Sequence, residues 1–316
     1  MGQAAVVLED VTKRYGAFTA VDHLSFEARA GRILGFLGHN GAGKTSSIRM
    51  ILGLVAPTSG RITVLGEADV SRVRQRIGFL PEERGLYRRM TPVTAIAFLA
   101  SLKGLGTAEA KRRARELLER HGLGDAADRE IRSLSKGMAQ KVQLLSALTH
   151  DPDLVILDEP FSGLDPVNQQ SLETIIRALA DRGATVIFST HVMQHAERLC
   201  DHVVLLASGR KVFDGSVAEA RASAPRTLVL EGPFDAAAVA DLPGLEGLTS
   251  EPSEEGGVRV TAALRAGAPA QEALRAAFAR GIDIQRFELK EPHLHDAFIT
   301  LTTRAGQDAA PNGAAA

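Results

Sequence analysis

The sequence reads Gly38-His39-Asn40-Gly41-Ala42-Gly43-Lys44-Thr45 between an apolar run at residues 32–37 and a helical pattern that starts at Lys44. This spacing is the pattern of a phosphate-binding loop, and it lies where such a loop must, after a strand and at the start of a helix. The glycines let backbone N–H groups close around phosphate oxygens, and the helix N-terminus adds a favourable dipole. We therefore predict that residues 38–45 and the next residue, Ser46, bind a nucleotide. Lys44 is expected to reach the β- and γ-phosphates and Thr45 to ligate Mg²⁺.

A second chemical signal follows a later apolar run. Asp158 and Glu159 come directly after Leu-Val-Ile-Leu at residues 154–157. Such runs occur in strands buried on both faces of a parallel sheet, and ligands bind at the carboxyl ends of these strands. Asp158 is predicted to hold Mg²⁺ through water, and Glu159 to polarise the attacking water as a general base. A solvated strand end is the alternative for two adjacent acids, but it fits poorly with a phosphate loop in the same chain.

The remaining pattern predicts an α/β fold of the P-loop NTPase class. Apolar runs alternate with helical patterns, which implies right-handed crossovers and a mainly parallel sheet. Short strands around a turn at Tyr15-Gly16 predict an antiparallel β subdomain, and a helical pattern over residues 91–122, with Thr107 as an N-cap, predicts a helical subdomain. Composition shifts near residues 220–225. We predict a cassette domain at 1–222, a small α+β domain at 226–303 and a disordered tail at 304–316.

Composition sets limits on function. Of the 316 residues, 45% are hydrophobic and the net charge is -1, so global attraction to nucleic acid is not expected. The single cysteine, Cys200, permits no intrachain disulfide and suits a reducing compartment. No apolar run approaches the roughly 18 residues that a membrane span needs. The chain is expected to be soluble, and any membrane pore would belong to another polypeptide.

In their order and gaps, these elements resemble the nucleotide-binding subunit of ABC transporters. Residues 134–138, Leu-Ser-Lys-Gly-Met, stand where that family has its signature, and residues 162–165, Ser-Gly-Leu-Asp, stand at its D-loop. His191 takes the place of the switch histidine, and Tyr15 falls where the family stacks an aromatic ring on adenine. The resemblance covers roughly residues 5–220 and implies an ATPase that uses ATP and Mg²⁺.

The resemblance also implies roles for these positions. Ser135 and Gly137 begin a helix, so a hydroxyl, a backbone N–H and the helix dipole point outward at an anion. In the family this signature serves ATP bound to a second subunit, which implies a head-to-tail homodimer of cassettes. Asp165 of the D-loop is counted among the nucleotide-binding residues. His191 is expected to contact the γ-phosphate and to take part in catalysis with Glu159 and Lys44.

Four positions depart from the usual family pattern. Lys136 and Met138 replace a glycine and a glutamine of the signature, and His39 replaces a frequent proline. Glu82 stands where the Q-loop usually has glutamine; a carboxylate would contact Mg²⁺ more strongly but would repel the phosphates. We include Glu82 with Thr45 and Asp158 as a predicted metal residue. The segments 80–87, 134–138 and 291–298 together resemble bacterial cassettes of the sodium-efflux and daunorubicin-resistance type, which have a small C-terminal domain.

We therefore predict the ATP-hydrolysing subunit of an exporter of ions, drugs or other small molecules. It would work with a separately encoded membrane permease, at the cytoplasmic face of a bacterial membrane, without nucleic acid. The alternatives are a soluble cassette ATPase of translation or DNA repair, and a regulatory binder without turnover. Six arginines around the Q-loop form either a solvated face or a permease-docking surface: Arg72, Arg74, Arg76, Arg84, Arg88 and Arg89.

Overall fold

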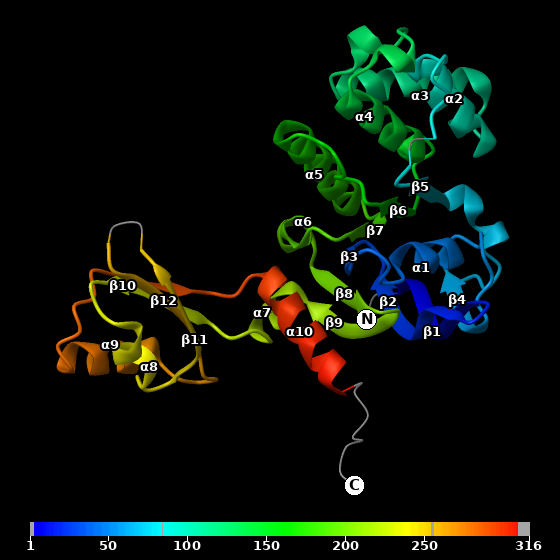
Figure 1. The fold of residues 1–316 in the computed structure, drawn as a ribbon. Helices are drawn as coiled ribbons and strands as arrows, with labels where there is room; N and C mark the ends of the chain where they lie inside the picture. Colours follow the sequence, from blue (N-terminus) through cyan, green and yellow to red (C-terminus); the bar gives the residue numbers. More distant parts are fainter. Residues whose placement is uncertain (1–2, 84, 254–255, 309–316) are drawn as a thin grey trace. The chain divides into compact units, whose positions relative to one another are not determined.

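The computed structural model describes residues 3–83, 85–253 and 256–308, which fold into two compact units, Met1–Val217 and Ala218–Ala316 (Figure 1). This division falls after residue 217, whereas the sequence predicts domains at 1–222 and 226–303, and those predicted bounds stay a prediction. None of the helices in the described ranges combines the length and the apolar character that spanning a bilayer requires.

The first unit is built on a six-stranded sheet in the order β5-β6-β7-β3-β8-β9. Every neighbouring pair is parallel except β8 with β9, which is antiparallel. All residues of β3, β6 and β7 are buried, which explains their apolar runs. The strands are β3 Ile33–Leu37, β5 Ile77–Leu80, β6 Leu154–Asp158, β7 Thr185–Thr190, β8 His202–Ala207 and β9 Arg210–Ser216.

A second, antiparallel sheet has the order β2-β1-β4. Its strands are β1 Ala4–Tyr15, β2 Phe18–Arg29 and β4 Ser59–Val64, so the predicted turn after Tyr15 is confirmed. Phe26 of β2 packs on Phe36 of β3, with ring centroids 5.3 Å apart. One hydrophobic core is therefore shared by the antiparallel and parallel sheets and by helix α1, Lys44–Ile51.

Three helices form the predicted helical subdomain: α2 Pro92–Leu102, α3 Thr107–Arg120 and α4 Lys136–Leu148 (Figure 1). They share a core of alanine and leucine side chains, which include Ala100, Ala114 and Leu145. Thr91 caps α2 through a hydrogen bond from the backbone N–H of Thr94. The prediction of Thr107 as an N-cap is wrong by one residue, because Gly106 has the extended backbone of the capping position.

Further helices of the first unit follow the strands β6 and β7. They are α5 Pro166–Asp181 and α6 Met193–Leu199. Four short 3₁₀ turns connect other elements: η1 Val70–Arg72, η2 Arg74–Arg76, η3 Gly124–Ala126 and η4 Ile131–Ser133. Asp165 precedes α5 as its N-cap, and His191 lies in the loop between β7 and α6.

The second unit has the strand order β11-β12-β10-β13, all antiparallel, which with its two intervening helices is a ferredoxin-like arrangement. The prediction of a small α+β domain is confirmed. Helix α10 extends to residue 308, so it includes the first five residues of the segment 304–316 that was predicted to be a disordered tail. Residues 309–316 lie outside the described residues. The elements are α7 Val217–Ala222, β10 Thr227–Gly232, α8 Ala236–Ala240, β11 Leu245–Pro252, β12 Val258–Leu264, α9 Ala270–Ala279, β13 Arg286–Lys290 and α10 Leu294–Asp308.

Candidate functional site

The glycine-rich loop connects β3 to α1 and is pressed against neighbouring backbone. A Cβ on Gly38 would lie 2.6 Å from the carbonyl oxygen of Leu206, and a Cβ on Gly43 would lie 2.6 Å from that of Ala20. Gly43 also has a φ of 102°, which favours glycine. By contrast, a Cβ on Gly41 would meet no atom of the described chain within 4 Å. The loop is thus fixed on its protein side and open on the side where phosphate oxygens would bind.

The ammonium of Lys44 lies inside this loop. Its side chain is only 6% exposed, and Nζ donates to the carbonyl oxygens of Gly38 at 2.7 Å and His39 at 3.2 Å. The same Nζ is 3.5 Å from Oε1 of Glu159. A buried cation on the first residue of a helix makes a concentrated site for anions.

Asp158 ends β6 as a buried carboxylate beside the loop. The hydroxyl of Ser189 donates to its Oδ1 at 2.5 Å, and the side chain of Thr45 also hydrogen-bonds to it. Burial raises the pKa of Asp158, and the hydrogen bonds from Ser189 and Thr45 oppose that shift. A cation bound here would favour the ionised carboxylate. The Thr45 hydroxyl and the Asp158 carboxylate supply oxygen ligands of the kind that Mg²⁺ prefers.

Glu159 has an unusual backbone conformation that aims its carboxylate into the site. Its φ is 47°, which a non-glycine residue adopts at a cost of about 1–3 kcal/mol. Its N–H donates to both Oγ and the carbonyl oxygen of Ser189, at 3.1 and 3.2 Å. Oε1 is buried and lies 3.0 Å from Nδ1 of His191, but it accepts no hydrogen bond of good geometry from the residues the structure describes. Such an oxygen is placed to accept a proton from a bound water.

The parallel register explains why these groups meet. Asp158 of β6 pairs with Ser189 of β7, so the chain segments beyond both strands leave the sheet at the same edge. His191 follows two residues later and keeps a half-exposed side chain. The structure therefore brings Lys44, Thr45, Asp158, Glu159 and His191 together, as the sequence had suggested.

Ser189 is a functional residue that sequence reasoning passed over, and replacing it tests the site. We expect Ser189→Ala to lose about 1–3 kcal/mol of unfolding free energy, because Asp158 and the N–H of Glu159 both lose a buried partner. We also expect ATP turnover to fall at least about tenfold, with a higher Mg²⁺ requirement. Unfolding in denaturant measures the loss of stability. Phosphate release at a series of Mg²⁺ concentrations measures the turnover and the Mg²⁺ requirement. Ser146→Ala is the control, because this buried serine donates within α4, to the carbonyl oxygen of Val142. An unchanged Mg²⁺ requirement in Ser189→Ala would contradict the assignment.

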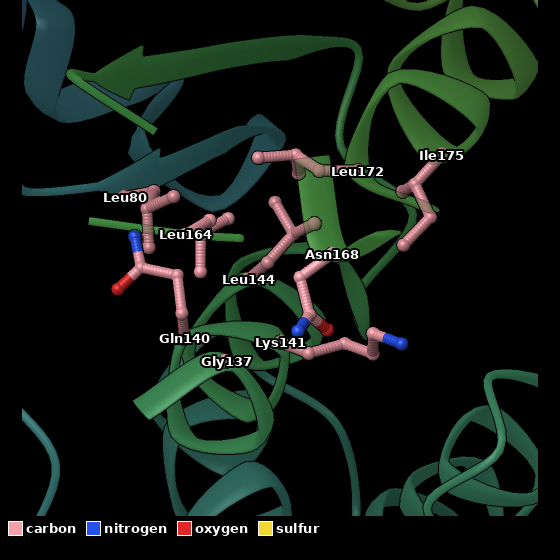
Figure 2. A pocket seen from close by; sticks show the side chains of 9 residues that line it. All are labelled: Leu80, Gly137, Gln140, Lys141, Leu144, Leu164, Asn168, Leu172 and Ile175. Atoms are coloured by element: carbon pink, nitrogen blue, oxygen red, sulfur yellow. The ribbon is translucent and has the colours of Figure 1, made fainter. Parts of the chain in front are cut away.

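The predicted signature begins α4. Ser135 is the N-cap, and its hydroxyl accepts from the N–H of Met138. A Cβ on Gly137 would lie 2.5 Å from Nδ2 of Asn168, so the glycine leaves room for the Asn168 side chain of α5 to lie against α4. Figure 2 shows Gly137 and Asn168 among the residues that line a narrow pocket between the two helices. Because Asn168 donates from N and Nδ2 to Asp165 at 3.0 and 2.6 Å, the signature and the D-loop are linked within one chain.

Two of the departures from the family pattern have clear structural settings. Lys136 extends over the D-loop, because a Cβ on Gly163 would collide with its ammonium. Glu82 is exposed in the loop after β5, and no hydrogen bond or ion pair joins it to Thr45 or Asp158 in the described part of the chain. Gln143 of α4 instead holds this loop by donating to the carbonyl oxygen of Glu83 at 3.1 Å. A metal role for Glu82 stays a prediction without a contact to support it.

Tyr15 lies at the end of the β1–β2 hairpin and is 45% exposed. It pairs with Phe18, two residues before Ala20, whose carbonyl oxygen faces Gly43. The ring of Tyr15 is also covered by Nζ of Lys13, 5.0 Å from its centroid. The hairpin therefore reaches the phosphate loop, which suits a ring stacked on a bound base.

The arginine cluster is exposed throughout its described members. Nε of Arg76 donates to Asp153 at 2.6 Å, and Arg72 is 3.5 Å from Glu67. Arg84 lies outside the described residues. Charge partners therefore account for part of this cluster, and both of its predicted interpretations stay open.

Comparison with known proteins bears on this geometry. Residues 21–162 match the ABC transporter family. The chain is 38% identical to the uncharacterized ABC transporter ATP-binding protein YhaQ of Bacillus subtilis, over 93% of this chain and 97% of that protein. It is 37% identical to the Nod factor export ATP-binding protein I of Cupriavidus metallidurans, over 67% of this chain and 71% of that protein. A solved ATP binding subunit of an ABC transporter superposes with a TM-score of 0.64 and 32% identity, over 69% of this chain and 92% of that chain.

Proposed function

The chain belongs to the ABC transporter family as an ATP-binding, ATP-hydrolysing subunit, and from this premise we propose that Lys44, Glu159 and His191 form its hydrolytic centre. One observation carries the proposal. Oε1 of Glu159 lies 3.0 Å from Nδ1 of His191 and 3.5 Å from Nζ of Lys44, although the three residues come from three separate segments. A base, a proton donor and a cation at these distances would suit phosphoryl transfer to water, which supports the proposal.

Each group then has a distinct task. Backbone N–H groups of residues 38–46 bind the phosphates, and Lys44 neutralises charge on the β- and γ-phosphates. Thr45 and Asp158 would hold Mg²⁺, which when bound neutralises the charge that develops on the phosphates. Glu159 orients the attacking water and takes up its proton, while His191 donates to the γ-phosphate. Tyr15 stacks on the adenine.

The active form is proposed to be a head-to-tail homodimer. Ser135 caps the N-terminus of α4 and Asp165 that of α5, and both residues are exposed. The phosphate loop of the same chain already provides one complete phosphate site. The signature of one subunit therefore serves the ATP held by the other, and Asp165 borders the same interface.

The partner that this dimer drives is proposed to be a separately encoded permease, which holds the cassette at the cytoplasmic face of a bacterial membrane. The Nod factor export relative supports export as the direction. Opening and closing of the dimer would move the permease as a rigid-body switch. Relatives named as transporter subunits favour this reading over a cassette ATPase of translation or DNA repair.

Reconstitution with the permease tests the proposal. The gene beside this one should encode a protein with about six apolar spans, each of the roughly 20 residues that cross a bilayer. We expect that protein to copurify with this chain and to raise its ATP turnover at least about threefold when a transported compound is added, because closure is coupled to the permease. Vesicles with the Lys44→Ala subunit are the control. Turnover that responds to ribosomes or to DNA, but not to the permease, would support the alternative class.

A further inference from the structure

A buried histidine outside the hydrolytic centre contacts the segment that carries Glu159. His195 of α6 is 4% exposed, and its ring stacks on Phe161 with centroids 4.0 Å apart and planes 14° from parallel. The ring of Phe161 also meets the ring of Phe188, with centroids 5.9 Å apart and planes at 80°. Phe161 therefore contacts both an α6 residue and a β7 residue.

This packing bears on the strained backbone of Glu159. The carbonyl oxygen of Glu159 accepts from the N–H of Ser162, so residues 159–162 form one turn with Phe161 inside it. On its N-terminal side, Glu159 is fixed by Ser189. A left-handed non-glycine residue persists only where the surrounding structure holds it in place. The stacked Phe161 ring supplies the anchor on the C-terminal side.

His195 is itself fixed by a charged cluster that joins α6 to α5. Arg198 donates from Nη2 to Glu173 at 2.7 Å and lies 3.2 Å from Nδ1 of His195. Nδ1 of His195 therefore faces both the guanidinium of Arg198 and the carboxylate of Glu173. Burial and the Arg198 charge lower the pKa of His195 in the same sense, against the opposing effect of Glu173, whose Oε1 lies 3.4 Å from Nδ1. Arg177 of α5 also donates to the carbonyl oxygen of Arg198 at 2.6 Å.

We propose that His195 is a positioning residue for ATP hydrolysis, which sets the aim of the Glu159 carboxylate through Phe161. This inference rests on the proposed role of Glu159. The histidine joins three segments of the centre: the turn after Glu159, helix α5 after the D-loop, and helix α6 after His191. An imidazole suits the position because it offers a flat face to Phe161 and a polar ring nitrogen to the Arg198–Glu173 pair at once, which an aliphatic side chain does not.

Substitutions of His195 and Phe161 in the full chain separate positioning from stability. We expect His195→Ala to lower kcat about 10- to 100-fold, because a small misplacement of a catalytic group costs that much. ATP affinity should stay within about twofold, since the phosphate loop is untouched. His195→Phe, which keeps an aromatic ring on Phe161, should recover most of the rate. Phe161→Leu should slow hydrolysis similarly, and the double variant His195→Ala/Phe161→Leu should be no slower, because both changes remove one stack.

Leu199→Ala is the stability control, because Leu199 is buried on the same helix, one turn beyond His195. It should lower the Tm as His195→Ala does and leave kcat near the wild-type value. The inference is overturned if His195→Ala turns over ATP at the wild-type rate, if His195→Phe is as slow as His195→Ala, or if Leu199→Ala loses equal activity. Wild-type speed in Glu159→Gln would instead remove the proposed role of Glu159 itself, so the two failures are distinct.

Discussion

Replacing Glu159 with glutamine is expected to slow ATP hydrolysis at least about 100-fold, because general-base catalysis contributes about 10²- to 10⁴-fold. The amide keeps the size and position of the side chain but cannot take a proton from water. ATP binding should remain, since the glycine loop and Lys44 are unchanged. Steady-state phosphate release and ATP affinity measured on the same preparation separate the two effects.

A matched substitution controls for the lost negative charge. Glu9 is exposed on β1, so Glu9→Gln changes the net charge equally and should hydrolyse ATP at the wild-type rate. Near-normal turnover by Glu159→Gln would remove Glu159 from the mechanism. A large loss of ATP affinity in that variant would show that the carboxylate shapes the binding site rather than the chemical step.

Lys44→Ala should lose ATP affinity about 10- to 100-fold. Lys44 is buried within the loop, and a hydrogen bond to a charged group contributes about 1.5–3 kcal/mol. The substitution also leaves the buried carboxylate of Glu159 with one fewer cation nearby. Isothermal titration calorimetry with ATP measures the change. Lys111→Ala, on an exposed position of α3, should bind as the wild type does. Unchanged binding by Lys44→Ala would contradict the phosphate-loop assignment.

The parts of the site that could be predicted are those whose residues lie close together in the sequence, in short contiguous segments. The phosphate loop depends on glycines with left-handed φ or close backbone approach, and Gly43 shows both. The buried strands could be predicted because a strand that is covered on both faces of the sheet must be apolar along its whole length. The acids at residues 158–159 could be placed because parallel strands end at a common edge.

The parts that could not be predicted depend on pairing between distant segments. Ser189 supports Asp158 only because β6 and β7 are adjacent and in register, and the sole signal was its place directly after an apolar run. Gln143 donates a hydrogen bond to the Q-loop backbone, and His195 stacks on Phe161. Neither contact produces a pattern in the local sequence. Glu82 shows the opposite case, since a family position suggested a metal ligand and the structure gives an exposed carboxylate without that contact.

In the proposed active form, two copies of this chain close around ATP, and each completes the site of the other. The most direct test is the mass of the Glu159→Gln variant by light scattering, with and without Mg²⁺ and ATP. We predict a monomer without nucleotide and a stable dimer with it, and we predict that adding Ser135→Arg, which places a bulky cation at the N-terminus of α4, prevents the dimer. A Glu159→Gln variant that binds ATP fully and remains monomeric would contradict the account.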